Sequence, residues 1–237
     1  MPTFAVTNAT IWVAGLDMTS YLNKATLKMM AAELDITTFG ATFRSRLGGL
    51  RDIDMAWDGF WTSIPDSAQF AQLGSANQAV TVSPRGTETD VAYFFQGEQF
   101  TYSQFGKIGE AAPFSATLKG SDGIAGAVRG QLTVVNRSVA GTGLIGSAVN
   151  LGLLGTGQYL YAAVHALTAG TTITIAVNSG TSSGSTPTQR AIYSAITTTG
   201  GYWLTRLAGP ISTDTWWRLN VTADTGTWTI SGAIGIQ

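Results

Sequence analysis

The stretch Arg51-Asp-Ile-Asp-Met-Ala-Trp-Asp-Gly-Phe-Trp61 decides the fold class of this 237-residue chain. Successive side chains of a β-strand point to opposite faces of a sheet, so alternation of apolar and polar residues predicts a half-buried strand. The apolar face consists of Ile53, Met55, Trp57 and Trp61. The opposite face carries the carboxylates Asp52, Asp54 and Asp58. The strand therefore has one side for a core and one acidic side left open.

The same alternation recurs along the first 140 residues and predicts a mainly β fold, an antiparallel meander with a single helix laid against it. One segment, Pro65–Leu73, breaks it: proline at the start, Asp66 in the first turn and Phe70/Leu73 three residues apart favour a short helix. The further predicted strands are Thr10–Gly15, Lys24–Ile36, Ala79–Ser83, Asp90–Gln96, Gln99–Ser103, Pro113–Lys119 and Ala127–Val135.

Composition excludes several classes of protein. Charged residues make up 11% of the chain and the net charge is −1, so no general attraction to nucleic acid or acidic membrane is expected. The absence of cysteine excludes disulfides and thiolate metal sites. A single histidine, His165, leaves no material for a mechanism with two imidazoles. No apolar run approaches the ~20 residues of a membrane span, so no membrane anchor is expected.

The charges themselves predict a domain boundary. Residues 1–140 carry 12 of the 14 acidic and 10 of the 13 basic side chains. Such a change of composition marks a boundary, which we place at the glycine-rich stretch after residue 140. Residues 141–237 read as evenly spaced short strands with Gly, Ser, Thr and Pro turns, which predicts a second β-sandwich of jelly-roll type.

Two short motifs are formal matches to known sites. Gly141-Thr-Gly-Leu-Ile-Gly146 fits the dinucleotide fingerprint, but no helical pattern and no acid follow it until Asp214, so we interpret it as a linker. Gly180-Thr-Ser-Ser-Gly184 fits a nucleophile elbow, but its polar flanks favour a hairpin tip. His165 lies in an apolar strand and is interpreted as a hydrogen-bonded core residue. We predict no catalytic residue, metal or cofactor, and no enzyme.

The connection between the two longest predicted strands is the most informative segment. It spans residues 37–50, whereas hairpins usually turn in two to five residues. Its aromatic, aliphatic and basic side chains have no evident core of their own, which indicates docking onto another subunit. These side chains are Phe39, Phe43, Arg44, Arg46 and Leu47.

The tryptophans of the second domain allow two interpretations. Trp203, Trp216 and Trp217 would form a surface platform on which sugars stack, or they would belong to the core of the sandwich.

Taken in order, the motifs of residues 9–137 resemble the major tail tube protein of long-tailed phages. The matching residues are Ala32–Asp35, Thr37–Gly40, Gly48–Asp52, Asp58–Trp61, the short helix after Pro65, Ala112–Phe114 and Arg129–Gly130. The second domain resembles a segment often attached to phage structural proteins, through Tyr161–His165, Thr188, Arg190, Gly209–Ile211, Asp214, Arg218 and Gly235–Gln237.

This resemblance implies that the first domain is an antiparallel β-sandwich flanked by the helix, and that the inner sheets of six copies join into a barrel. It implies a virion protein, made in the bacterial cytoplasm, that forms hexameric rings stacked into a tail tube. It also implies that loop 37–50 stacks the rings, that the second domain lies outside, and that a tape measure protein and tail-end proteins are partners. DNA would pass through the lumen without specific binding, because a bore lined by Asp52, Asp54 and Asp58 repels phosphates.

Two alternatives stay open at this point. One is a tail-tip or receptor-binding protein whose second domain binds glycans, and the other is a capsid decoration protein.

Overall fold

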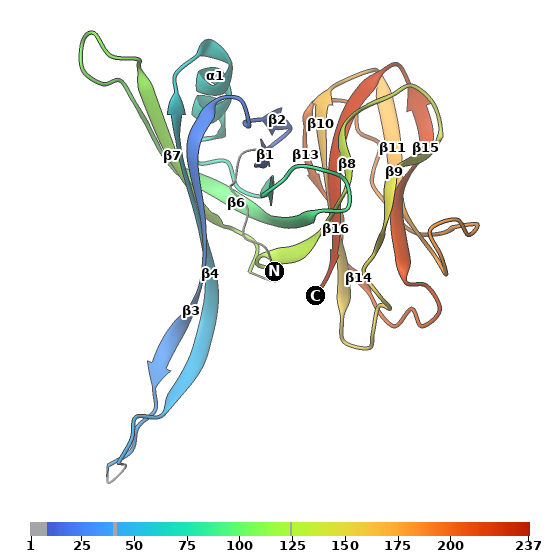
Figure 1. Ribbon diagram of the computed structural model, residues 1–237, viewed down its shortest axis with the longest axis horizontal. Coiled ribbons are helices and arrows are strands. Elements are labelled where there is room, and N and C mark those ends of the chain that lie inside the picture. Colours follow the sequence, from blue (N-terminus) through green and yellow to red (C-terminus); the bar gives the residue numbers. More distant parts are fainter. Residues whose placement is uncertain (1–8, 40–41, 124) are drawn as a thin grey trace. The chain divides into compact units, whose positions relative to one another are not determined.

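The computed structural model describes residues 9–39, 42–123 and 125–237 (Figure 1). Over these residues the chain consists of antiparallel strands and one short helix, α1 (Ser63–Gln72). The mainly β fold class with a single helix is thereby confirmed. Two compact units are present. Unit 1 consists of the residues up to Ser20, of Gln78–Gln96 and of Val128–Gln237, and unit 2 of Tyr21–Asn77 and Gly97–Ala127.

These units are not the two segments expected from composition. Strand β8 (Val128–Val139), which precedes the expected boundary, pairs with β16 (Trp228–Ile236), which follows it. The division at residue 140 therefore stays a prediction about two segments of sequence and does not describe the compact units.

Unit 2 is a sheet with α1 on one face. Its strands lie in the order β3 (Leu22–Asp35), β4 (Arg46–Phe60), β7 (Pro113–Gly120) and the C-terminal part of β6 (Val91–Gln104). The alternation in β4 is the predicted one for Ile53, Met55 and Trp57, which are buried. The prediction is wrong for Trp61, which lies beyond the end of the strand and is exposed. The α1 side is the apolar side, since two residues of that face, Gln99 and Tyr102 of β6, hydrogen-bond to the helix.

Strand β4 is longer than expected, and the connection before it is shorter. The strand begins at Arg46, so residues 46–50 of the predicted loop 37–50 belong to it. Leu47 lies directly opposite Leu34, and Gly48 opposite Glu33. The glycines Gly48 and Gly49 lie beside a register shift between Ala31 and Glu33, so this part of the predicted connection belongs to the ladder. The connection itself consists of residues 36–45.

The N-terminal half of β4 leaves the sheet as a two-stranded ribbon. Strand β7 pairs with β4 over Asp54–Phe60, whereas β3 pairs with β4 down to Arg46. Beyond β7, β3 is the only partner of β4 among the described residues. We call this ribbon, from Met29 through the connection to Ile53, the arm (blue in Figure 1).

Unit 1 contains the predicted C-terminal β-sandwich. Its larger sheet runs β13 (Gly200–Trp203), β10 (Tyr159–Thr168), β16, β8, β6, β5 (Gln78–Ser83), β1 (Thr10–Val13) and β2 (Leu16–Asp17), with β14 (Leu207–Ala208) also on β10. The second sheet has the order β12 (Thr188–Ile192), β11 (Thr172–Gly180), β15 (Trp216–Thr225) and β9 (Gly143–Asn150). Side chains of both sheets, among them Val164, Ile175 and Leu219, form one core.

The segment interpreted as a linker is a strand. Residues 143–150 form β9, and Gly146 packs so closely on β8 that a Cβ there would clash with the Thr133 carbonyl. Gly146 also has a φ of +63°, in the left-handed region that favours glycine. The linker interpretation is therefore wrong. The match to the dinucleotide fingerprint is also explained, because this glycine serves sheet packing and no helix follows it.

Within the described ranges no helix is long and apolar enough to cross a membrane.

Candidate functional site

Exposed apolar side chains are concentrated in unit 2. Of the large apolar side chains that the described residues expose, all but Leu144, Leu153 and Ile192 belong to this unit. Monomeric soluble proteins rarely expose contiguous apolar patches, and such patches mark interaction sites. The exposed members in unit 2 are Met29, Leu34, Ile36, Phe39, Phe43, Leu47, Leu50, Phe60, Trp61, Ile64, Phe70, Leu73, Phe100, Phe105 and Ile108.

The arm carries the predicted docking residues. Phe39 and Phe43 are exposed in the connection, next to the exposed Arg44. Leu47 lies in β4 and, together with Leu34 opposite, is about half exposed. Arg46 is not a free cation, because its Nε lies 2.6 Å from Glu33 Oε1. At this exposure the ion pair contributes little stability, so it orients Arg46 more than it stabilises the arm.

Strand β3 is an edge strand without cover. None of its 14 residues is buried, and β4 is its only strand partner in the described part of the chain. A long exposed edge offers unpaired N–H and C=O groups to a strand of another molecule. The edge and the apolar tip together make the arm a surface for association.

The three carboxylates Asp52, Asp54 and Asp58 lie on the face of β4 away from α1, but lysines share that face. Lys24 Nζ is 3.7 Å from Asp58 Oδ2, and Lys119 Nζ is 3.6 Å from Asp54 Oδ1. Lys28 lies directly opposite Asp54 on β3. The face is therefore a mixed array of charges, not the purely acidic line that β4 alone suggested, because the neighbouring strands supply cations.

The tryptophans do not form an exposed row. Trp217 is completely buried in the sandwich core and donates its Nε1–H to the Gly152 carbonyl at 3.1 Å, which corrects the surface interpretation of this residue. Trp203 packs against Phe94 and Tyr161. Trp216 is half-buried beside a shallow hollow on the outer face of the second sheet. With Trp217 buried and Trp203 packed against other rings, the partly covered indole of Trp216 is left, whereas the stacking of a sugar needs an exposed aromatic platform.

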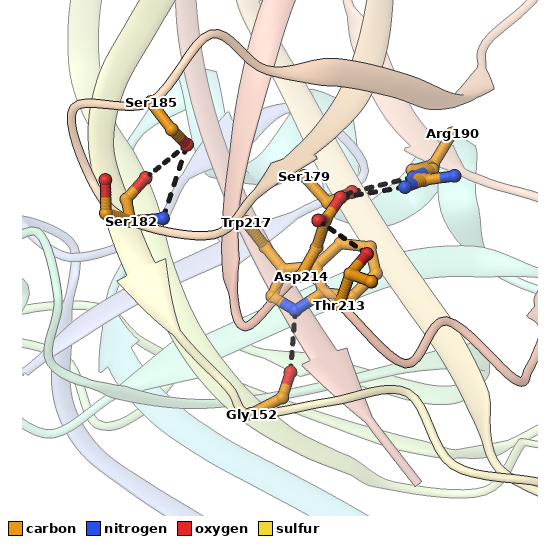
Figure 2. Close-up of polar contacts among 8 residues, drawn as sticks. All are labelled: Gly152, Ser179, Ser182, Ser185, Arg190, Thr213, Asp214 and Trp217. Carbon is orange, nitrogen blue, oxygen red and sulfur yellow. Dashed lines mark hydrogen bonds and ion pairs between the residues drawn. The ribbon is translucent and has the colours of Figure 1, made fainter.

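A polar cluster closes one end of the second sheet (Figure 2). The Asp214 carboxylate accepts hydrogen bonds from Ser179 Oγ at 2.6 Å and from Arg190 at 2.8 Å, while Thr213 donates to its other oxygen. Arg190 first, and then Ser179, hold the pKa of Asp214 below its usual value. Ser179 donates to a carboxylate and meets no imidazole, so the cluster fastens β11 and β12 to the loop before β15.

In the sequence, Arg190 and Asp214 are matching residues of the second domain, but nothing there predicts that the two side chains meet. The segment resembling a nucleophile elbow connects β11 to the antiparallel β12, with Ser182 and Ser185 bonded to each other. It is the predicted hairpin tip.

His165 is a buried residue whose hydrogen bonds connect separate segments of unit 1. Its Nδ1 accepts from the Gly15 N–H at 3.4 Å, so the proton is on Nε2, which donates to Thr81 Oγ1 at 2.9 Å. Trp12 stacks on the ring. Burial lowers the pKa of His165 to about 3, against a small opposing effect of Asp17. This arrangement confirms the interpretation as a hydrogen-bonded core residue.

Among the residues that the structure describes, no group of three or more His, Cys, Asp or Glu side chains is placed to hold a metal ion.

No protein-family model matches the chain, and a search of curated proteins finds no match. Among solved structures, the chain is similar to one from the virion of a native gene transfer agent particle, with a TM-score of 0.42 and 14% identity over 51% of this chain and 95% of that chain. It is also similar to the SPP1 Dit protein of a phage adsorption apparatus, with a TM-score of 0.35 and 10% identity over 95% and 98% of the two chains.

A third likeness is to a chain of the sheath–tube complex of an extracellular contractile injection system, with a TM-score of 0.39 and 12% identity over 54% and 92%. Because each of these TM-scores is below 0.5, none of the likenesses assigns a function to this chain.

Proposed function

We propose that this chain is a structural protein of a phage tail, in which six copies form a ring and rings stack into the tube that conducts DNA. The observation that carries the proposal is the arm: a two-stranded ribbon with an uncovered edge and exposed phenylalanines at its tip. In an isolated subunit such a ribbon contributes no hydrophobic stabilisation, since its apolar side chains stay in water. A subunit that docks the ribbon on another copy buries them.

The geometry of the association follows from the kind of surface. A contact in which the arm tip of one copy meets a different surface of the next copy is head-to-tail. Head-to-tail contacts close into rings or propagate as open assemblies. Rings joined through the edge strand β3 and stacked through the arms use both possibilities and cover that edge.

The mixed charged face suits the lumen of such a tube. A bore with unpaired lysines would bind phosphates, whereas Lys24 and Lys119 pair with Asp58 and Asp54, and Lys28 lies directly opposite Asp54. The lysines and aspartates of this face thus balance, and the face offers DNA no excess of positive charge. We therefore place Asp52, Asp54 and Asp58 in the lumen, where they let DNA pass without specific binding.

On this proposal the protein is located in the virion tail, after synthesis in the bacterial cytoplasm. Its main partners are further copies of the same chain, and a tape measure protein and tail-end proteins complete the assembly. Residues 141–237 lie on the tube exterior, and no enzymatic role is assigned to them.

Electron microscopy of the purified protein at high concentration tests the proposal. Rings with sixfold symmetry and tubes are expected. A chain that stays monomeric at high concentration contradicts it, and trimers would indicate a capsid decoration protein instead. The glycan-binding alternative has no structural support, because Trp217 is buried and Trp203 is packed.

A further inference from the structure

Helix α1 is turned with its apolar side chains outward. Ile64 is 55% exposed and Phe70 is 71% exposed, whereas Gln69 is completely buried against the sheet. A surface helix normally places its apolar stripe on the core and its polar residues in water. Here Pro65 and the polar Gln69 are buried while the two large apolar side chains face water, so the outer face of α1 gains from being covered.

Two polar contacts fix this orientation. Tyr102 of β6 donates its hydroxyl to Asp66 Oδ1 at 2.6 Å, and Gln99 donates its side-chain amide to the Gln69 carbonyl at 3.1 Å. Rolling the helix to bury Phe70 would break the bond to Asp66 and carry Gln69 off the sheet. The exposure of Phe70 is therefore built into the fold.

The C-terminal end of α1 forms a small apolar surface. Phe70 and Leu73 are exposed there, and Leu73 pairs with Gln99 of β6. The last turn of the helix contains no basic residue, so the partial negative charge of its end is not countered by the helix itself. We call Phe70 and Leu73 the α1 end face.

The arm tip and the α1 end face lie at different levels along β4. The tip precedes Arg46, whereas Leu73 pairs with Gln99, which lies opposite Leu118 of β7 and so at the level of Met55. At a rise of ~3.3 Å per residue, the strand from Arg46 to Met55 separates the two levels by roughly 30 Å. The arm of one copy cannot reach its own α1 end face.

We infer that the α1 end face receives the arm tip of a second copy, with Phe39 and Phe43 against Phe70 and Leu73. Arg44, next to Phe43, then meets the negative end of the helix, where a cation is favoured. The inference rests on the proposed function and names the acceptor of its stacking contact. Donor and acceptor lie apart along the strand direction, so each contact adds one copy along that direction.

A cysteine pair tests the contact directly, because the chain has no cysteine of its own. The double variant Phe43→Cys/Phe70→Cys, assembled and then oxidised with glutathione disulfide, should give a ladder of covalent multimers on a non-reducing gel. Phe43→Cys/Ile192→Cys is the matched control, since Ile192 is exposed to a similar degree but lies on β12. It should give dimers at most.

A charge placed on the face gives a second readout. Phe70→Asp should leave the circular dichroism spectrum unchanged and shorten tubes at least tenfold in electron micrographs. Ile64→Asp makes the same change on the same helix outside the α1 end face, and it should assemble as the unmodified protein does.

The outcomes separate the two levels of the argument. Tubes from the unmodified protein together with normal tubes from Phe70→Asp, or with no ladder from the cysteine pair, overturn the α1 end face and leave the tube proposal standing. Absence of any assembly by the unmodified protein overturns both.

Discussion

The imidazole of His165 donates a hydrogen bond to Thr81 Oγ1 at 2.9 Å and joins β10 to β5 without exposure to solvent. A neutral ring suits this position, because a charged one would have to give up its hydration and push a second proton toward the Gly15 amide. The hydrogen bonds of the uncharged His165 side chain thus connect the N-terminal strands of unit 1 to its sandwich.

Stability should consequently fall in mild acid. The pKa of His165 is about 3 in the folded chain against 6.5 for an ordinary histidine, so the unfolded chain binds the extra proton between these values. The stabilisation is complete above about pH 6.5 and is lost as the pH falls toward 3, at about 1.4 kcal/mol per pH unit. Urea unfolding at a series of pH values measures it.

The control for this prediction is His165→Gln, which keeps a polar side chain that does not titrate. The variant should be less stable at neutral pH but should lose the slope between about pH 6.5 and 4.5, above the range where carboxylates protonate. Since His165 is the only histidine, an unchanged slope in the variant would disprove its role.

Removing the buried carboxylate of the polar cluster should cost far more than removing an exposed one. Asp214→Asn takes the charged acceptor from Ser179 and Arg190 and should lower the free energy of unfolding by about 1–3 kcal/mol. Asp58→Asn breaks the exposed pair with Lys24 and should change it by less than about 1 kcal/mol. Equal effects in urea unfolding would contradict the structural role of the cluster.

Polar residues at the arm tip should abolish assembly without unfolding the subunit. In Phe39→Ser/Phe43→Ser the changed side chains are exposed in the isolated chain, so its stability should stay within about 0.5 kcal/mol. Sedimentation velocity should then show small species where the unmodified protein forms tubes. Leu144→Ser/Leu153→Ser, two exposed apolar residues of unit 1, is the matched control. Normal tubes from the arm variant would exclude the stacking role.

Neutralising the carboxylates of the charged face should make the tube adhere to DNA. In Asp52→Asn/Asp54→Asn/Asp58→Asn, Lys24 and Lys119 lose their paired carboxylates, and Lys28 loses the charge opposite it. DNA retention should rise and should weaken with salt, by a slope of roughly 0.9 per freed cation.

Adding Lys24→Gln, Lys28→Gln and Lys119→Gln to that variant should restore the low retention. If the triple asparagine variant retains no more DNA than the unmodified tube at low salt, the face does not line the lumen.

The sequence predicts those features that depend on local periodicity. Alternation at Ile53, Met55 and Trp57 correctly gives the buried face of β4, and the proline and Asp66 correctly give α1. The periodicity of one strand does not reveal which side chains the neighbouring strands place beside it. The lysines that face Asp54 and Asp58 come from β3 and β7, and their register cannot be deduced from β4.

Glycine-rich segments are misread for a related reason. Gly48–Gly49 and Gly143–Gly146 have the composition of loops, but partner strands hold both in ladders. The outward rotation of α1 is invisible to helical periodicity, because Tyr102 and Gln99 fix it from a strand about thirty residues away. Phe70 and Leu73, three residues apart, indicate the helix itself but not the side that faces solvent.

The separation of the arm tip from the α1 end face along β4 has a consequence for growth. A polymer built from this contact has unlike termini: one presents only unfilled helices, the other only free ribbons. Elongation can then be directional, and a factor that initiates the filament needs a different surface from one that caps it. A cap that mimics Phe39 and Phe43 would stop one terminus and leave the other able to extend.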